Sequence, residues 1–265
     1  MRAVALHADV LVATSAIWQT NCTIVRGHVE VQDAAGPGQP GESFLIDSPV
    51  LPDELDALPT LLGQSGFPPP SGLLATHGDW DHLLGRLAFP GIAQGCAEST
   101  AARMQASPGE AQRELRAFDE EHFIERDRPL ALGAVQALPV PGRCSVGDRE
   151  LELHAACGHT GDGMAVLVGW AGVLLTGDYV SPVELPVLGA TGMVDAYVDT
   201  LRRLRPLVQR AEHVVPGHGR VLASKEALAI LDEDLAYVEN VGPSSSTRLR
   251  RSLRSVRRPG SGLPR

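Results

Sequence analysis

The sequence predicts an α/β fold in which helices cover buried β-sheets. Short segments rich in Val, Ile, Leu and Thr alternate with longer segments of helical periodicity over most of the chain. The 265 residues, 43% of them hydrophobic, are enough for one large core or two small ones. No apolar run reaches the roughly 18–20 residues that a membrane helix needs. These observations favour a single α/β domain away from the membrane.

The expected strands are short, bounded by turn residues and rich in side chains of high β-propensity. They are residues 10–18, 21–27, 43–49, 72–76, 151–156, 164–170, 172–177 and 212–217. The first residues also read as a strand, because His7 and Asp9 interrupt the apolar pattern that a signal peptide requires. We therefore expect no targeting segment and a cytoplasmic protein.

The expected helices are residues 52–66, 81–89, 108–123, 194–208 and 224–241. Residues 52–66 are typical, with Pro near the start, acids in the first turn and apolar residues at helical spacing. Residues 33–42 are predicted to form a loop, and an irregular stretch is expected between the third helix and the strand at 151. The organised domain is predicted to span residues 1–242.

The C-terminal residues 243–265 form a separate segment by composition. They contain seven Arg and no acid, although the whole chain has a net charge of −9. Because this segment is also rich in Ser, Pro and Gly, we expect a disordered basic tail with no specific partner. The acidic remainder is a poor general binder of nucleic acid. The four Cys are far apart in the sequence, so buried reduced thiols are expected rather than disulfides.

Residues able to bind metal follow five of the expected strands. In ATHGDWDHLLG (residues 75–85), two His and two Asp occur within six positions. In chain order, the strand-end residues are Asp47, then His77, Asp79, Asp81 and His82, then His159, Asp178 and His218. The carboxyl ends of strands are where loops converge in α/β proteins. We therefore expect these side chains to meet at one site.

The order of these motifs resembles that of the metallo-β-lactamase superfamily. That family has a strand-end Asp, then H-x-H-x-D-H, G-H-T-x-G, T-G-D and P-G-H-G. Here they stand as LID (45–47), HGDWDH (77–82), GHTGDG (158–163), LLTGD (174–178) and VVPGHG (214–219). The resemblance covers residues from about 10 to 240. It implies a four-layer αββα sandwich and two adjacent metal sites.

The resemblance also implies a role for each motif residue. His77, Asp79 and His159 would hold one metal ion, and Asp81, His82 and His218 would hold a second. Asp178 would bridge the two ions, while Asp47 would accept the N–H of a ligand His and fix its tautomer. Two divalent ions are therefore expected, with zinc favoured and iron or manganese as alternatives.

Position 79 departs from the family pattern, which usually has His there. Three interpretations are open: Asp79 is a direct ligand, only one metal ion binds tightly, or the site has lost its activity. A direct carboxylate ligand would make the site less positive and shift its preference toward manganese or iron. The flavodiiron proteins of the same superfamily carry Glu at this position and use two irons.

The resemblance implies a metal-dependent hydrolase that uses a metal-bridging hydroxide on an ester, lactone, thioester or phosphoester. Asp81 would orient the nucleophile, and Tyr179 would either donate to the oxyanion or pack beside the site. The alternatives are an iron redox enzyme, either an oxidase or a sulfur dioxygenase, and a nuclease. The expected partner is a small-molecule substrate, with no membrane or nucleic acid.

Overall fold

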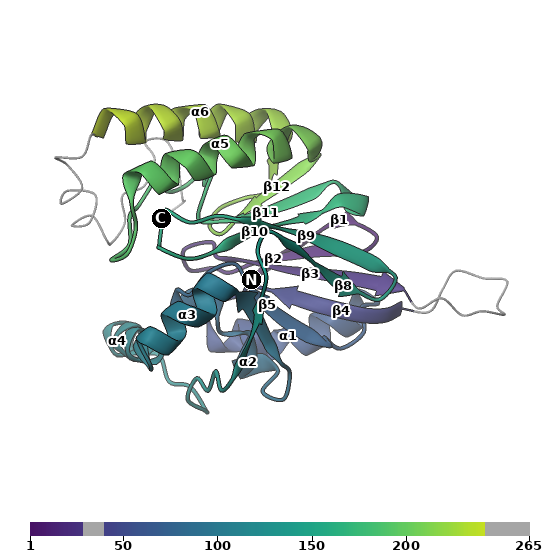
Figure 1. Cartoon of the computed structure of the whole chain (residues 1–265). Coiled ribbons are helices and arrows are strands. Elements are labelled where there is room, and N and C mark those ends of the chain that lie inside the picture. The colour runs from purple at the N-terminus through teal and green to yellow at the C-terminus, as the bar shows by residue number, and fades with distance from the viewer. Residues whose placement is uncertain (29–39, 242–265) are drawn as a thin grey trace, which may run out of the picture.

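Two β-sheets lie face to face between two layers of helices (Figure 1). The computed structural model describes residues 1–28 and 40–241. The strands of the first sheet, in spatial order, are β1 (Arg2–His7), β2 (Val10–Thr14), β3 (Asn21–His28), β4 (Pro40–Ile46), β5 (Gly72–Ala75), β6 (Gln94–Ala97) and β7 (Val135–Leu138). Those of the second are β13 (Leu222–Ala223), β12 (His213–Pro216), β11 (Val173–Gly177), β10 (Met164–Val168), β9 (Arg149–Ala155) and β8 (Gly142–Val146).

The helices cover the outer face of each sheet (Figure 1). Those beside the first sheet are α1 (Pro52–Gln64), α2 (Gly85–Ala88), α3 (Glu98–Ala106) and α4 (Glu110–His122), with the 3-10 turn η1 (Trp80–His82). Those beside the second sheet are α5 (Val194–Arg210) and α6 (Ser224–Val241), and the short turn η2 (Gly169–Ala171) joins β10 to β11. This is the αββα sandwich that the sequence predicts.

Alternation of side chains explains why the strands read as continuous apolar runs. In β2, Val10 and Val12 pack between the sheets, whereas Leu11 packs toward the helices of the first layer. In β11, Val173 packs between the sheets and Leu174 packs toward α5 and α6. Both faces of these strands are therefore buried, so both must be apolar.

Parallel pairing brings the functional loops to one edge of the sandwich. Ile46 of β4 pairs with Leu74 of β5, and Leu175 of β11 pairs with Val215 of β12, in both cases with the strands running parallel. The carboxyl ends of paired parallel strands lie side by side. The loops that follow β4 and β5 therefore emerge side by side, and so do those that follow β11 and β12.

Two predicted elements differ most from the structure. The strand predicted for residues 10–18 ends at Thr14, and the chain then turns through Trp18 and Gln19, whose φ of 53° and 54° is a left-handed conformation that a strand excludes. The helix predicted for residues 81–89 is reduced to η1 and the four residues of α2. Between them, the backbone N–H of Leu84 donates to the hydroxyl of Ser48 rather than to a helical carbonyl.

The prediction of an irregular stretch before residue 151 was wrong, because β7 and β8 lie there. The sequence indicates no strand or helix for residues 94–106, but these residues form β6 and α3. The sequence of β6, QGCA, has no β-branched residue, and its position is set by parallel pairing with β5 and β7. By contrast, α6 begins and ends where the sequence predicts.

Within the described residues, no helix combines the length and apolar character needed to span a bilayer. All four Cys are free thiols, with Cys22 and Cys96 buried and the other two half-buried. The predicted basic tail at 243–265 and most of the predicted loop at 33–42 lie outside the described residues.

Candidate metal centre

Seven His and Asp side chains from four loops meet at the edge where β5, β9, β11 and β12 end. Their ligand atoms form three overlapping groups, within each of which all atoms lie within 4.8 Å of one another. The groups are His77, Asp79 and His159; Asp81, His82 and His218; and His77, His82 and Asp178. The structure thus brings together every residue that the sequence predicts as a metal ligand, and Asp178 lies with one His from each of the other two groups, His77 and His82.

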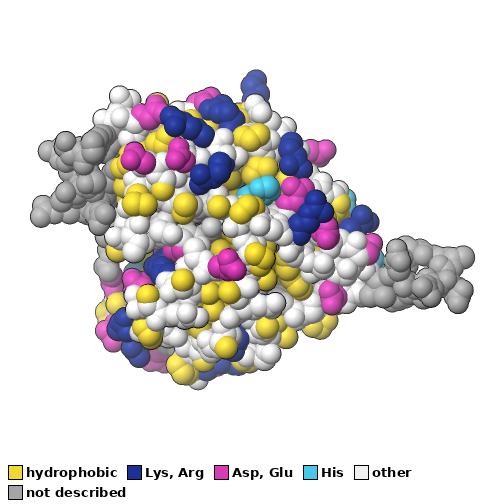
Figure 2. Space-filling view, viewed as in Figure 1, with side chains coloured by type: hydrophobic (Ala, Val, Ile, Leu, Met, Phe, Trp, Pro, Cys, Tyr) yellow, Lys and Arg dark blue, Asp and Glu magenta, His cyan; other side chains and the backbone are white. Residues whose placement is uncertain are grey.

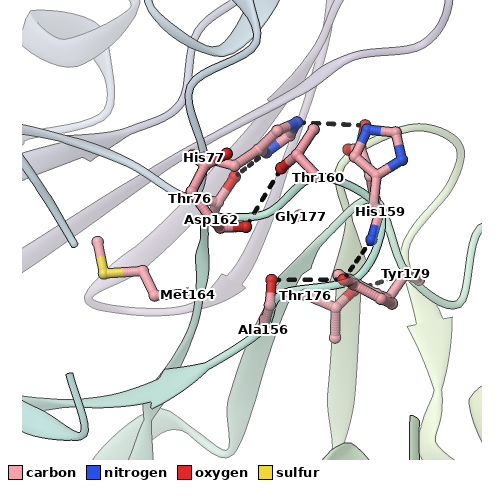
Figure 3. Close-up of a pocket in the computed structure, with 11 residues that line it drawn as sticks. Thr76, His77, Ala156, His159, Thr160, Asp162, Met164, Thr176, Gly177 and Tyr179 are labelled. Atoms are coloured by element: carbon pink, nitrogen blue, oxygen red, sulfur yellow. Dashed lines mark hydrogen bonds and ion pairs between the residues drawn. The ribbon is translucent and has the colours of Figure 1, made fainter. Parts of the chain in front are cut away.

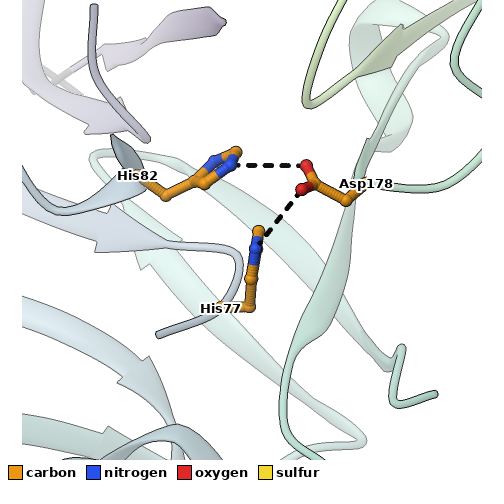
Figure 4. A group of neighbouring side chains, drawn as sticks. All are labelled: His77, His82 and Asp178. Carbon is orange, nitrogen blue, oxygen red and sulfur yellow. Dashed lines mark ion pairs between the residues drawn. The ribbon is translucent and has the colours of Figure 1, made fainter. Parts of the chain in front are cut away.

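Asp178 lies at the middle of the centre, with four imidazoles around it. Its Oδ2 lies 3.5 Å from the Nε2 atoms of three of them, and its Oδ1 lies 3.3 Å from the Nε2 of the fourth. The three are His77, His159 and His218, and the fourth is His82. Figure 4 shows His77 and His82 reaching Asp178 from the facing sheet. One carboxylate therefore faces both sets of ligands.

The other ring nitrogen of each His, Nδ1, lies near a fixed oxygen. This contact orients the ring and leaves Nε2 directed toward Asp178. The contacts are His77 with Thr76 Oγ1 at 3.1 Å, His82 with Asp47 Oδ2 at 3.0 Å, His159 with the Val187 carbonyl at 2.9 Å, and His218 with the Trp18 carbonyl at 3.2 Å. In His77, His159 and His218 this contact has hydrogen-bond geometry. An N–H directed at the oxygen then leaves the lone pair on Nε2, the atom that a metal would take.

Asp47 is held in an unusual backbone conformation, with φ of 58°. Non-glycine residues adopt this left-handed region at a cost of order 1 kcal/mol, and they cluster at functional sites. Its carboxylate accepts hydrogen bonds from the backbone N–H of Thr76 at 2.7 Å and from its hydroxyl at 2.8 Å. Oδ2 of the same carboxylate lies 3.0 Å from Nδ1 of His82. That Asp47 accepts the N–H of this ring and fixes its tautomer stays a prediction.

The donor set fits a pair of divalent cations. His77 Nε2, His82 Nε2 and Asp178 Oδ1 are buried and have no hydrogen-bond partner within the described residues. Ligand atoms around a tetrahedral ion with bonds of 2.0–2.2 Å lie about 3.3–3.6 Å apart. The Nε2 atoms of His77, His82, His159 and His218 lie 3.3–3.7 Å from Asp oxygens, which is close to that spacing. These separations are too long for strong hydrogen bonds.

The charges of the centre favour a bound cation. Burial disfavours the charged form of His159, but Asp79 and Asp178 outweigh it and raise its pKa to about 9. Burial acts in the same way on His218, where Glu184 and Asp178 raise the pKa to about 10. Without a metal, the carboxylates therefore hold protons on these rings, and metal binding must displace them.

The two carboxylate oxygens of Asp79 have different partners. One faces the metal centre, and the other contacts an Arg that sequence reasoning missed. Its Oδ2 lies 3.3 Å from Nε2 of His159 and 3.7 Å from Nε2 of His77. Its Oδ1 accepts a hydrogen bond at 2.7 Å from Nη1 of Arg103 in α3. Arg103 belongs to no motif, so only the tertiary structure places it beside the metal ligands.

Asp162 is a second residue that sequence reasoning missed, although it stands in the motif GHTGDG. Its side chain is buried and accepts hydrogen bonds from the backbone N–H of Gly78, the hydroxyl of Thr100 and Nη1 of Arg103, at 2.8–3.0 Å. Asp162 therefore links the loop of His77 to α3. Its place beside a ligand in the motif was the available signal.

Tyr179 directly follows Asp178 but is buried against α5. Its hydroxyl accepts the backbone N–H of His159 at 2.9 Å and donates to the carbonyl of Ala156 at 3.4 Å (Figure 3). Its ring packs on Tyr197 with centroids 4.6 Å apart. These contacts favour a role in holding the loop of His159, and the role of Tyr179 as an oxyanion donor stays a prediction.

An aromatic cluster lies beside the His218 side of the centre. The ring of Trp18 contacts those of Trp80 and Phe118, with centroids 5.5 and 4.9 Å apart. The Trp18 side chain remains 40% exposed, whereas Trp80 and Phe118 are buried. The loop that carries Trp18 is anchored by buried Glu54 of α1, which accepts the hydroxyl of Ser15 and the backbone N–H of Ala16.

Residues 18–218 match the family model described as the metallo-beta-lactamase superfamily. A search of curated proteins gives no match to the chain.

Several solved structures share the fold at low sequence identity. A metallo-beta-lactamase family protein from Thermus thermophilus has a TM-score of 0.65 and 20% identity, with 89% of this chain and 81% of that chain covered. A metallo-beta-lactamase from Pontibacter korlensis has a TM-score of 0.62 and 17% identity, with 90% and 99% covered. The DIM-1 metallo-beta-lactamase has a TM-score of 0.60 and 17% identity, with 91% and 98% covered.

Proposed function

The chain belongs to the metallo-beta-lactamase superfamily, and on that premise we propose that it is a metal-dependent hydrolase with a dinuclear centre. The observation that carries this proposal is the arrangement around Asp178: four imidazole Nε2 atoms lie 3.3–3.5 Å from its carboxylate oxygens, and each Nδ1 lies near a fixed oxygen. A purely structural ion-pair network would not need three buried ligand atoms to stay without hydrogen-bond partners among the described residues.

Each half of the centre would hold one ion. His77, Asp79 and His159 would bind the first, Asp81, His82 and His218 the second, and Asp178 would contribute to both. Two ions bound in this way supply a water molecule of lowered pKa and polarise the bond to be hydrolysed. Asp81, whose Oδ2 lies 3.4 Å from Nε2 of His218, would accept a hydrogen bond from the attacking water and orient it.

The substrate class that we propose is a small ester, lactone, thioester or phosphoester. The exposed ring of Trp18, next to the Nδ1 contact of His218, offers an apolar surface at the edge of the centre. This surface suits a substrate with an apolar group adjoining the bond that is cleaved. The cytoplasmic location remains a prediction from the sequence.

Assays of the metal-loaded protein on ester, lactone, thioester and phosphodiester panels test this proposal. We expect hydrolysis of at least one class, and its loss in the double variant His77→Ala/Asp178→Ala. The Asp199→Asn variant, whose side chain is 60% exposed, serves as a matched control and should keep full activity. No activity with zinc, manganese and iron alike, or activity that survives the double variant, would show that the proposal is wrong.

An iron redox enzyme is a second candidate, because Asp79 directs a carboxylate oxygen at the first ion position. Oxygen ligands shift the preference of a site from zinc toward harder metals. Elemental analysis of protein from cells grown without added zinc distinguishes the two. Iron in the purified protein would support the redox candidate, and zinc alone would remove it.

A nuclease has less support from the described residues. On the face in Figure 2, Arg and Lys side chains are interspersed with Asp and Glu. Exposed Arg side chains pair with acids elsewhere too; Arg202, for example, lies 3.1 Å from Glu239. A nucleic-acid site is expected to gather positive charge on one surface. The basic tail lies outside the described residues, so its role stays a prediction.

A further inference from the structure

Arg103 places a guanidinium directly beside the metal-ligand candidate Asp79, and its side chain is 17% exposed. The same atom, Nη1, donates to Oδ1 of Asp79 at 2.7 Å and to Oδ1 of Asp162 at 3.0 Å. Hydrogen bonds between a guanidinium and a carboxylate are among the stronger ones in proteins. Arg103 therefore fixes one oxygen of Asp79 on the side away from the metal centre.

The second oxygen of Asp79 is left facing the centre. Oδ2 lies 3.3 Å from Nε2 of His159 and 3.7 Å from Nε2 of His77, the spacing of atoms that share one cation. A carboxylate that is free to rotate could present both oxygens, or neither. With Oδ1 held by Arg103, only one oxygen is available, as with the single nitrogen of an imidazole.

Arg103 also opposes the charge that Asp79 adds. Asp79 contributes a negative charge at a position where a neutral imidazole would contribute none. A guanidinium 2.7 Å from that carboxylate offsets the added charge at close range. Glu110, whose Oε2 lies 3.8 Å from Nε of Arg103, helps to hold the guanidinium in place.

We propose that Arg103 is a positioning residue that makes Asp79 a one-oxygen metal ligand and thereby sets the metal affinity of the His77–Asp79–His159 half of the centre. This inference rests on the proposed metal-dependent function. A purely structural role for Arg103, tying α3 to the loop of His77 through Asp162, is the competing explanation. The two explanations differ in whether the effect of Arg103 depends on the residue at position 79.

A double-mutant cycle on metal binding tests this dependence. Zn²⁺ and Mn²⁺ affinities are measured by competition with a chromophoric chelator, and bound metal per chain by elemental analysis after dialysis. Loss of a residue that holds a ligand typically weakens metal binding about 10–100-fold. We expect Arg103→Met to lower the affinity for one ion by that factor and to leave the other ion bound.

The second side of the cycle uses Asp79→His, which supplies a neutral ligand with no oxygen for Arg103 to hold. In this background we expect Arg103→Met to change the affinity by less than about threefold. An equal loss in both backgrounds would assign Arg103 a structural role and overturn the inference. Asp162→Asn measures the structural explanation by itself, because it weakens the link between the loop of His77 and α3 and leaves the contact of Arg103 with Asp79. A loss of affinity in Asp162→Asn equal to that in Arg103→Met would also assign Arg103 a structural role.

Folding of each variant is checked by circular dichroism and by thermal unfolding of the metal-free protein. If Arg103→Met does not fold, Arg103→Lys replaces it, since Lys keeps the charge but loses the planar fork of donors. Wild-type protein that binds no metal would contradict the proposed function itself. Wild-type protein that binds two ions, with unchanged affinity in the Arg103 variants, would contradict this inference alone.

Discussion

Oδ2 of Asp47 lies 3.0 Å from Nδ1 of His82. Asp47 directly follows β4 and has a left-handed backbone conformation, with φ of 58°. The hydrogen bonds that Asp47 accepts from Thr76 keep its carboxylate in place. A carboxylate at Nδ1 favours the proton there and leaves Nε2 of His82 free for a metal. The strained backbone at Asp47 thus serves a ligand that lies 35 residues later in the chain.

Asp47→Asn should weaken metal binding at the Asp81–His82–His218 group. An amide that still accepts from the backbone of Thr76 would turn its NH₂ toward His82, and this favours the opposite tautomer of the ring. We expect about 10–100-fold lower affinity for one ion, measured by chelator competition. Equal affinities for the variant and wild type would show that Asp47 does not control His82.

The shared position of Asp178 predicts different metal contents for two variants. His159 belongs to one group of ligands, whereas Asp178 lies within 3.5 Å of Nε2 of His159 and of His218, one from each half. Elemental analysis should therefore find one ion fewer in His159→Ala and loss of both ions in Asp178→Ala. The same metal content in the two variants would contradict the bridging role.

Tyr179→Phe separates the two roles open to this side chain. If the hydroxyl holds the loop of His159, its loss leaves the backbone N–H of His159 without its acceptor. We then expect the free energy of unfolding to fall by about 1–3 kcal/mol, with a modest effect on kcat. If instead the hydroxyl stabilises an oxyanion, kcat should fall about 10²–10³-fold with unchanged stability. Urea unfolding and steady-state kinetics on the same preparation decide between them.

The buried carboxylate of Glu54 is expected to make the free energy of unfolding fall at acid pH. Burial disfavours its ionised form, but hydrogen bonds from Ser15 and from the backbone N–H of Ala16 outweigh it and lower the pKa of Glu54 from 4.5. Because the folded pKa lies below the unfolded one, the ionised side chain stabilises the protein above about pH 4.5. This contribution is lost as the pH falls through the folded pKa.

We therefore expect Glu54→Gln to lower the free energy of unfolding by about 1–3 kcal/mol at pH 7, and by less at pH 3. Urea unfolding of metal-free protein at both pH values measures the difference. Asp53→Asn, which changes an exposed acid in the same turn of α1, is the control and should change stability by less than about 1 kcal/mol. A penalty that does not depend on pH would show that the charge of Glu54 is not responsible.

The sequence by itself determined the layered fold and the identity of the residues that gather at the centre. Apolar strands such as β2 and β11, buried on both faces, leave a pattern that is readable without the structure. The strand-end His and Asp residues stand beside Gly in short motifs, and those motifs depend on local geometry. At Gly217, for example, a Cβ would collide with Oδ1 of Asp178, so only Gly allows this approach.

Only the tertiary structure decided which oxygen of Asp79 faces the centre and what holds the other. Arg103 lies 24 residues away, on a helix that the sequence did not predict, and no local pattern links it to Asp79. Glu54 is a similar case, because it reads as an ordinary acid in the first turn of a helix but anchors the loop that begins at Ser15. Periodicity and motifs report how a residue relates to its neighbours in the chain. Contacts between distant segments depend on how the layers pack, and a single sequence carries no local signal of them.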